Sequence, residues 1–253
     1  MMADLEAVAA GPERFAVLAA ETTARMLSRA VSQRGRASVG FSGGSTVGPV
    51  FDALVALATQ PPTADLYVDW ERVSVGQVDE RVVAPAHPDR NAAVLLTRLV
   101  DALPVRPASV ALLPVEDVEV TDAVGGGRWR DEARRRLVQL AGAETRFDVL
   151  QLGLGPDGHT ASLVPGDPVL DVVDRPVALT GPYQGHRRLT LTYPVLNAAR
   201  ARVWWVVSGQ DHTKARALHS LVTGDVSVPA GRVERASTVI VTDGDPPGGS
   251  DRT

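Results

Sequence analysis

The sequence has 253 residues, of which 44% are hydrophobic, and this is enough to bury one large core. Its net charge of −4 argues against a broad nucleic-acid-binding surface, which would need clustered cations. No apolar stretch approaches the roughly 18 residues of a membrane span, and residues 1–15 place acids where a signal peptide has a basic start. Because cysteine is absent, disulfides and thiolate metal sites are excluded, and we expect a cytoplasmic protein. Separately, we expect a monomer or a weak homodimer.

Hydrophobic periodicity, interrupted by Gly and Pro, predicts helices that alternate with strands. The predicted helices are 3–33, Thr46–Thr59, Asn91–Ala102, a basic helix that Gly125–Gly127 opens and that runs to about Leu140, and Asp211–Val222. The predicted strands are Ala37–Phe41, Val73–Val78, Val110–Leu113, Phe147–Leu154, Leu189–Thr192, Val203–Val207 and Thr238–Val241. This order predicts one α/β domain over residues 1–243, with a mostly parallel sheet covered by helices on both faces. Residues 244–253 are rich in Gly and Pro, and we expect a disordered tail there.

The segment 147–166, FDVLQLGLGPDGHTASLVPG, is the most informative part of the chain. A buried strand ends in a Gly/Pro/Asp-rich loop that presents Asp157 and His159, and a helix-compatible stretch, 159–163, follows. In an open α/β sheet, ligands bind at the carboxyl ends of the strands. The sequence therefore predicts that His159 is placed for chemistry.

The same segment contains a literal G-x-G-x-x-G match at Gly153, Gly155 and Gly158. A lone match of this kind is weak. Pro156 and Asp157 lie inside the match, no clean strand-turn-helix with an acidic residue about 20 positions on accompanies it, as a dinucleotide site requires, and the match lies past mid-chain. We therefore do not predict a nicotinamide cofactor.

A second polar loop, Ser42-Gly43-Gly44-Ser45-Thr46, follows the predicted strand Ala37–Phe41. The two glycines allow a tight turn and close approach to a ligand, and Ser45 or Thr46 can cap the next helix. Free amides at a helix amino end bind phosphate. An ordinary capped glycine turn explains the same residues equally well. No lysine follows the glycines, so a nucleoside triphosphate site is not indicated.

Charged residues follow other strands. Asp79-Glu80-Arg81 comes directly after Val73–Val78, where Arg81 could bind an anion and the acids could orient it; a solvated loop is the alternative. Arg188 precedes an alternating Leu-Thr segment, and Lys214, the only lysine among 26 basic residues, opens a predicted helix. Either could complete a phosphate site or be a surface charge.

The histidines give no sign of a metal site. His87, His186, His212 and His219 lie in contexts typical of loops or surfaces. No pair has H-x-x-x-H spacing, so we predict no metal.

Four ordered motifs resemble the 6-phosphogluconolactonase family, within the larger group that includes glucosamine-6-phosphate deaminase. They are FSGGST, VDERVVAPAHPDRN, FDVLQLGLGPDGHTASLVPG and RLTLTYPVLN, and they span most of the chain from Ala37 to Val233. The resemblance implies a Rossmann-like fold with deaminase-like topology. It also implies a cytosolic hydrolase, without metal or cofactor, that opens 6-phosphoglucono-δ-lactone. The sequence departs from the usual pattern at Val78, at Val47 and in the spacing before Lys214.

The resemblance also assigns residues. It makes His159 the catalytic histidine, Arg81 a catalytic and substrate-binding cation, and Arg188 and Lys214 substrate-binding cations. Residues 43–46 then form the phosphate-side loop, and Asp79 also contacts substrate. The hypothesis is that neutral His159 takes a proton from water as it attacks the lactone carbonyl. Amides around Gly155–Gly158, or Arg81, would stabilise the oxyanion. Asp157 would shape the loop or orient the imidazole.

Two other functions are weaker. A deaminase of the same group has an acidic residue five positions after the histidine and an acid–acid–tyrosine triplet, where this chain has Val164 and Arg81. A phosphosugar-sensing regulator without turnover would need a DNA-binding helix-turn-helix, for which the chain has no room.

Overall fold

The computed structural model describes residues 5–119, 122, 127–208 and 214–244. Within them, a central sheet has the strand order β1-β10-β9-β6-β2-β3-β5, and every neighbouring pair is parallel. Its strands are β1 (Glu6–Ala9), β2 (Ala37–Phe41), β3 (Val73–Gln77), β5 (Ser109–Ala111), β6 (Val149–Gly153), β9 (Ala201–Val206) and β10 (Thr238–Thr242).

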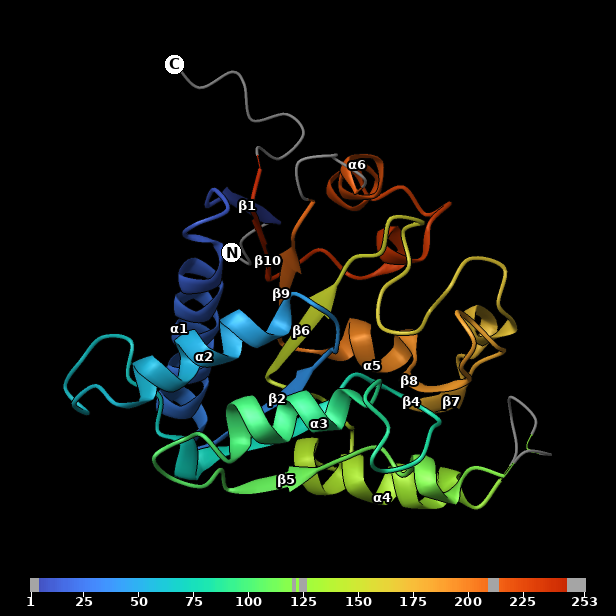
Figure 1. Cartoon of the computed structure of the whole chain (residues 1–253), viewed down its shortest axis with the longest axis horizontal. Helices are drawn as coiled ribbons and strands as arrows, with labels where there is room; N and C mark the ends of the chain where they lie inside the picture. Colours follow the sequence, from blue (N-terminus) through green and yellow to red (C-terminus); the bar gives the residue numbers. More distant parts are fainter. Residues whose placement is uncertain (1–4, 120–121, 123–126, 209–213, 245–253) are drawn as a thin grey trace.

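Helices cover both faces of this sheet (Figure 1). The helices are α1 (Phe15–Arg34), α2 (Val47–Ala58), α3 (Asn91–Leu95), α4 (Trp129–Ala141), α5 (Tyr193–Ala198) and α6 (Ala215–Thr223). A π-helical segment (Leu96–Val100) continues α3, and 3-10 turns lie at Trp70–Arg72, Val115–Asp117, Pro168–Asp171 and Pro229–Arg232.

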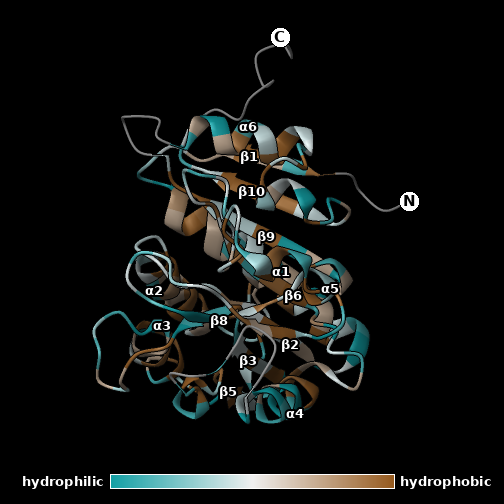
Figure 2. Ribbon diagram, turned by 90° about the vertical axis from the view of Figure 1, so that its right-hand side faces the viewer, coloured by the Kyte–Doolittle hydropathy of each residue, from teal (hydrophilic) through white to brown (hydrophobic). Residues whose placement is uncertain are grey.

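The core is divided between the two faces, as strand β9 illustrates. Val203 and Trp205 join the hydrophobic cluster beneath α1, α2 and α3, whereas Trp204 and Val206 join the cluster beneath α4, α5 and α6. Apolar residues on both sides of a strand are typical of a parallel sheet between helices. Figure 2 shows the hydrophobic colouring on interior strands such as β10 and the hydrophilic colouring on α4. The predicted fold class is confirmed.

A second, three-stranded antiparallel sheet stands beside the central one (Figure 1). It consists of β4 (Asp79–Arg81), β8 (Arg188–Leu191) and β7 (Val177–Leu179), in the order β4-β8-β7. The solvated loop considered as the alternative for Asp79–Arg81 is not found, because these residues pair with β8. Arg81 and Arg188 are direct partners in that pairing, so the small sheet brings two candidate cations together.

Two predicted helices were wrong in part or entirely. The helix over 3–33 divides into strand β1 and helix α1, because Gly11, with φ +68°, and the following proline end the strand and turn the chain. The helix-compatible stretch 159–163 is not helical. There Thr160 and Leu163 form an isolated bridge around Ala161, which has φ +51°.

Several other boundaries differ from the sequence prediction. The helix from Asn91 becomes π-helical at Leu96, the strand at Val110–Leu113 is Ser109–Ala111, and helix α5 was not predicted. The start of the helix at Asp211, His212 and most of the Gly125–Gly127 run lie outside the described residues, as does the predicted tail beyond Gly244. Among the described helices, none is both long and apolar enough to cross a bilayer.

Candidate active site

A cavity of about 200 Å³ opens at the carboxyl ends of the central strands. The chain leaves β2 toward one edge of the sheet and leaves β6 toward the other, so their ends form a topological switch point, where ligands bind in this class of fold. The predicted site residues that line this cavity are Gly43, Gly44, Ser45, Thr46, Asp79, Arg81, Gly155, His159, Arg188 and Lys214. We call it the carboxyl-edge cavity. The structure thus brings together groups that lie up to 171 positions apart in the sequence, from Gly43 to Lys214.

The glycine loop after β2 is held by two neighbouring elements. The backbone N–H of Ser42 donates to Oε1 of Gln151 on β6, at 2.9 Å. A side chain at Gly43 would collide with Asn91, and Gly44 has φ +112°. The expected cap was wrong in one respect: Thr46, the residue that precedes α2, makes no side-chain capping bond. The amino end of α2 therefore faces the cavity without a side-chain cap, as an anion-binding helix end requires.

Asp157 and His159 form a hydrogen-bonded pair. Nδ1 of His159 lies 2.5 Å from Oδ1 of Asp157, and the backbone N–H of His159 donates to the same oxygen at 3.2 Å. Burial acts to raise the pKa of Asp157, but His159 and a hydrogen bond from Tyr183 lower it below its ordinary value. A carboxylate at Nδ1 leaves Nε2 as the nitrogen that can accept a proton. This contact is the one through which Asp157 would orient the imidazole, which stays a prediction.

Glycine is required at two positions of the loop that follows β6 and carries Asp157 and His159, which we call the histidine loop. A Cβ on Gly155 would lie 2.1 Å from the His159 ring, and Gly158 has φ +80° with Val228 against it. The N–H of Gly155 donates to the carbonyl of His159, and the N–H of Gly158 donates to the carbonyl of Gly155. These two amides already donate within the loop, and this favours Arg81, the other predicted group, as the donor that stabilises an oxyanion.

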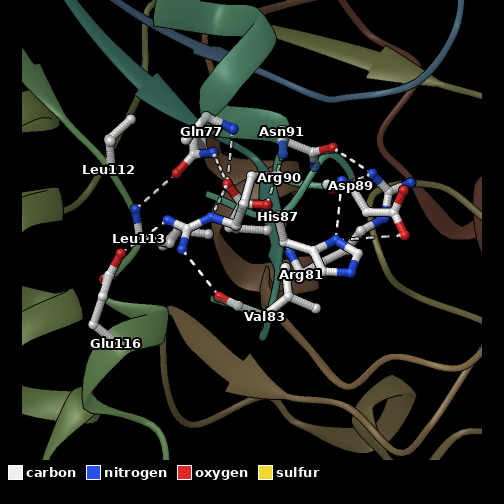
Figure 3. Close-up of polar contacts among 12 residues, drawn as sticks. Gln77, Arg81, Val83, His87, Asp89, Arg90, Asn91, Leu112, Leu113 and Glu116 are labelled. Atoms are coloured by element: carbon white, nitrogen blue, oxygen red, sulfur yellow. Dashed lines mark hydrogen bonds and ion pairs between the residues drawn. The ribbon is translucent and has the colours of Figure 1, made fainter. Parts of the chain in front are cut away.

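Arg81 is fixed at the edge of the cavity by two acceptors (Figure 3). One terminal nitrogen, Nη1, donates to the carbonyl of Asp89 at 2.7 Å and to Oδ1 of Asn91 at 2.9 Å. Nδ2 of Asn91 donates in turn to the carbonyl of Asp79. The acceptors of Arg81 are uncharged, so its positive charge is not neutralised by them.

Beneath Arg81, a buried carboxylate organises the start of α3. Glu80 is 0% exposed and accepts from the backbone N–H groups of Arg81, Asn91 and Ala92, each at 2.8 Å. Arg90, 3% exposed, forms an ion pair with Glu80 at 3.2 Å and another with Glu116 (Figure 3). This network explains why an acid stands between Asp79 and Arg81: it ties the strand that carries Arg81 to the helix that carries Asn91.

Arg188 and Lys214 are desolvated cations without a hydrogen-bonding partner for their charged groups among the described residues. Burial lowers the pKa of Arg188, which is 5% exposed, and Asp79 partly opposes this. Burial also lowers the pKa of Lys214, partly opposed by Asp243. A desolvated charge without a partner is costly, and an anion in the cavity would supply the missing interactions.

Asp79 balances this positive charge. Its carboxylate accepts a hydrogen bond from Oγ of Ser162 at 2.6 Å. Burial raises the pKa of Asp79, the Ser162 hydrogen bond lowers it, and the net effect is a rise.

Several residues of the site were not predicted to belong to it. Asn91, Gln151, Ser162 and Tyr183 hold Arg81, the glycine loop, Asp79 and Asp157, respectively. Asn91 lies in the VDERVVAPAHPDRN motif, and Gln151 and Ser162 lie in FDVLQLGLGPDGHTASLVPG, so their segments were signalled although their roles were not. Tyr183 lies in none of the four motifs.

The histidines outside the histidine loop form no metal site in the described part of the chain. His186 contacts Oδ2 of Asp89 through Nε2 at 2.9 Å, and Nδ1 of His87 lies 3.8 Å from the same oxygen. No group of three or more potential metal ligands occurs among the described residues.

The family model described as glucosamine-6-phosphate isomerases/6-phosphogluconolactonase matches residues 10–241. The chain belongs to this family and is an enzyme of it. A 6-phosphogluconolactonase of Rattus norvegicus is 35% identical over 240 residues, which cover 91% of this chain and 86% of the relative. One from Nostoc sp. is 33% identical over 191 residues, 76% of this chain and 74% of the relative.

The solved structure of 6-phosphogluconolactonase from Thermotoga maritima superposes with a TM-score of 0.76 at 20% identity, covering 94% of this chain and 98% of that one. At this identity, the structural likeness shows a shared fold.

Proposed function

We propose that this enzyme hydrolyses 6-phospho-D-glucono-1,5-lactone to 6-phospho-D-gluconate, the lactone-opening step of the pentose phosphate pathway. The observation that carries the proposal is that His159, hydrogen-bonded to Asp157, lines the same cavity as two desolvated cations, Arg188 and Lys214. The charged groups of these cations have no hydrogen-bonding partner among the described residues. The curated relatives named above carry this activity in their names.

In the proposed mechanism, Nε2 of His159 accepts a proton from a water molecule as its oxygen attacks C1 of the lactone. The bond from C1 to the ring oxygen then breaks, and the imidazolium returns the proton to that oxygen. A lactone carbonyl is already electrophilic, so no covalent intermediate is needed. Atoms balance with one water consumed and no cofactor.

We propose that Arg81 stabilises the negative charge that develops on the carbonyl oxygen. The amides of Gly155 and Gly158 already donate within their loop. The guanidinium of Arg81 uses Nη1 for Asp89 and Asn91, and this leaves its other N–H groups for substrate. A cation held in advance stabilises such charge without reorganisation.

The phosphate group is assigned to the glycine loop, Arg188 and Lys214. The amino end of α2 offers backbone amides, and the two cations supply charge-assisted hydrogen bonds. Binding of this remote group would position the lactone against His159. Asp79, between Arg188 and Ser162, would accept from a sugar hydroxyl. We further propose a cytoplasmic monomer or weak homodimer, which light scattering during size exclusion would test.

The deciding experiment generates the phospholactone in situ from glucose 6-phosphate with a dehydrogenase and follows its decay with and without this enzyme. Faster decay, at a rate proportional to enzyme concentration, is expected. Unchanged decay would refute the proposal. A parallel assay with glucosamine 6-phosphate checks for ammonia release, which would favour the deaminase reaction instead.

A further inference from the structure

Tyr183 contacts both halves of the proposed machinery, although no motif of the sequence includes it. Its hydroxyl donates to Oδ2 of Asp157 at 3.0 Å, while Oδ1 of that carboxylate contacts His159. Its ring packs edge-on against the His159 ring, with centroids 5.4 Å apart. The guanidinium carbon of Arg188 lies 4.9 Å above its ring centroid.

The backbone that carries Tyr183 is a tight hairpin. Tyr183 and His186 exchange two backbone hydrogen bonds, of 3.0 and 3.2 Å. Between them, Gln184 and Gly185 both have positive φ, of 49° and 84°, as a two-residue type I′ turn requires. The far side of the hairpin is held by the contact of His186 with Asp89. Tyr183 therefore projects from a braced turn, so its hydroxyl is held against Asp157.

We propose that Tyr183 is a positioning residue that orients the His159 imidazole through Asp157 and supports the guanidinium of Arg188 through its ring. A carboxylate with only one oxygen restrained can rotate about its Cβ–Cγ bond. With Oδ2 held by the Tyr183 hydroxyl, Oδ1 stays directed at Nδ1 of His159. Stacking of Arg188 on the ring uses no hydrogen-bond donor, so those donors stay available for an anion.

Two variants separate the two functions of Tyr183, which are orienting His159 and supporting Arg188. Tyr183→Phe removes only the hydroxyl, so kcat should fall about 3- to 10-fold, the effect of one hydrogen bond, while KM stays within about twofold. Tyr183→Leu also removes the ring beneath Arg188, so KM should rise about 3- to 10-fold in addition. This kinetic arm rests on the proposed lactone hydrolysis.

A pH measurement separates positioning from a merely structural role. Without the Tyr183 hydroxyl, the Asp157 carboxylate can rotate and Oδ1 is no longer held against Nδ1 of His159, so the contact that favours the protonated imidazole is weakened. The acid limb of kcat/KM in Tyr183→Phe should therefore move to lower pH by about 0.5 unit. The NMR titration of the His159 ring, assigned by its loss in His159→Gln, should move by the same amount, and this readout needs no turnover.

The matched control is Tyr193→Phe, which removes a tyrosine hydroxyl that donates to the carbonyl of Pro229 and lies outside the cavity lining. It should lower the Tm without moving either titration. If Tyr183→Phe leaves both the acid limb and the His159 titration at their wild-type positions, the positioning role is wrong. If the NMR titration moves but no variant hydrolyses the lactone, the positioning role stands and the proposed function fails.

Discussion

The two ends of the central sheet both carry arginines, but they hold them differently. At the amino ends of the strands, a cavity of about 160 Å³ is lined by Arg34, Arg36, Arg146 and Arg200 around Asp148; we call it the amino-edge cavity. Asp148 accepts from Arg34 at 2.8 Å and pairs with Arg200 at 3.3 Å. In the carboxyl-edge cavity, Arg188 and Lys214 form no such ion pair with any residue of the described part of the chain.

The helices sharpen this difference. The last turn of α4 lines the amino-edge cavity, and helix carboxyl ends carry partial negative charge that suits arginine. The carboxyl-edge cavity instead meets the amino end of α2, which adds positive potential to its cations. At the amino edge, Arg34 and Arg200 pair with a carboxylate of the fold, and we propose that the cations at the carboxyl edge bind a ligand instead. A cluster of basic residues therefore indicates a ligand site only where carboxylates or other acceptors of the protein do not already pair with its charges.

The largest expected effect comes from removing the base at the carboxyl edge. His159→Ala should lower kcat by roughly 10²–10⁴, the usual contribution of a general base, with little change in Tm. Coupled assay of lactone decay measures this. His219→Ala, on the exposed face of α6, provides the control and should be unaffected. Near-normal turnover in His159→Ala would contradict the assignment of His159 as the general base.

The next effect compares one arginine from each end. Arg188→Ala should raise KM about 10- to 100-fold with kcat nearly unchanged, because a charge-assisted contact to substrate is lost. Arg200→Ala makes the same chemical change at the amino-edge cavity and should leave both constants unaltered. A fall in kcat at constant KM would show instead that Arg188 acts on the transition state.

The sequence predicted the carboxyl edge better than it predicted the molecule around it. The loops at Gly43 and His159 follow buried strands directly, so periodicity and topology place them at one edge. The partners Asn91, Ser162 and Tyr183 reach the site only through tertiary packing, which no local pattern encodes. The small sheet was missed for a similar reason: Asp79-Glu80-Arg81 is too short and too polar to resemble a strand, and it becomes one only by pairing with β8.

A smaller effect is expected when the amino-edge cavity loses its carboxylate. Asp148→Asn weakens the contacts to Arg34 and Arg200 and one of those to Ser38, and should destabilise the fold by about 1–3 kcal/mol, the range for hydrogen bonds to a charged group. Chemical unfolding measures the loss, and kcat/KM should stay constant. Inorganic phosphate should raise the Tm of the variant more than the Tm of the wild type, because an anion can then occupy the place of the carboxylate. A change in kcat/KM would contradict the separation of the two ends.

The smallest effect concerns Asp79, the carboxylate that faces Arg188. Burial raises its pKa above the ordinary 3.8, so over the window between the two values the folded state binds more protons than the unfolded state. Stability then falls as the pH rises through that window, and the cost is complete at neutral pH. Asp79→Asn removes this cost, so its Tm should exceed the wild-type value at pH 7 by roughly 2–4 °C, the shift that about 1 kcal/mol produces in a chain of this size. The difference should shrink as the pH falls toward 3.8. A variant less stable than wild type at pH 7 would mean that the attraction of Asp79 to Arg188 outweighs its burial, and the carboxyl edge would then be partly self-neutralised, like the amino edge.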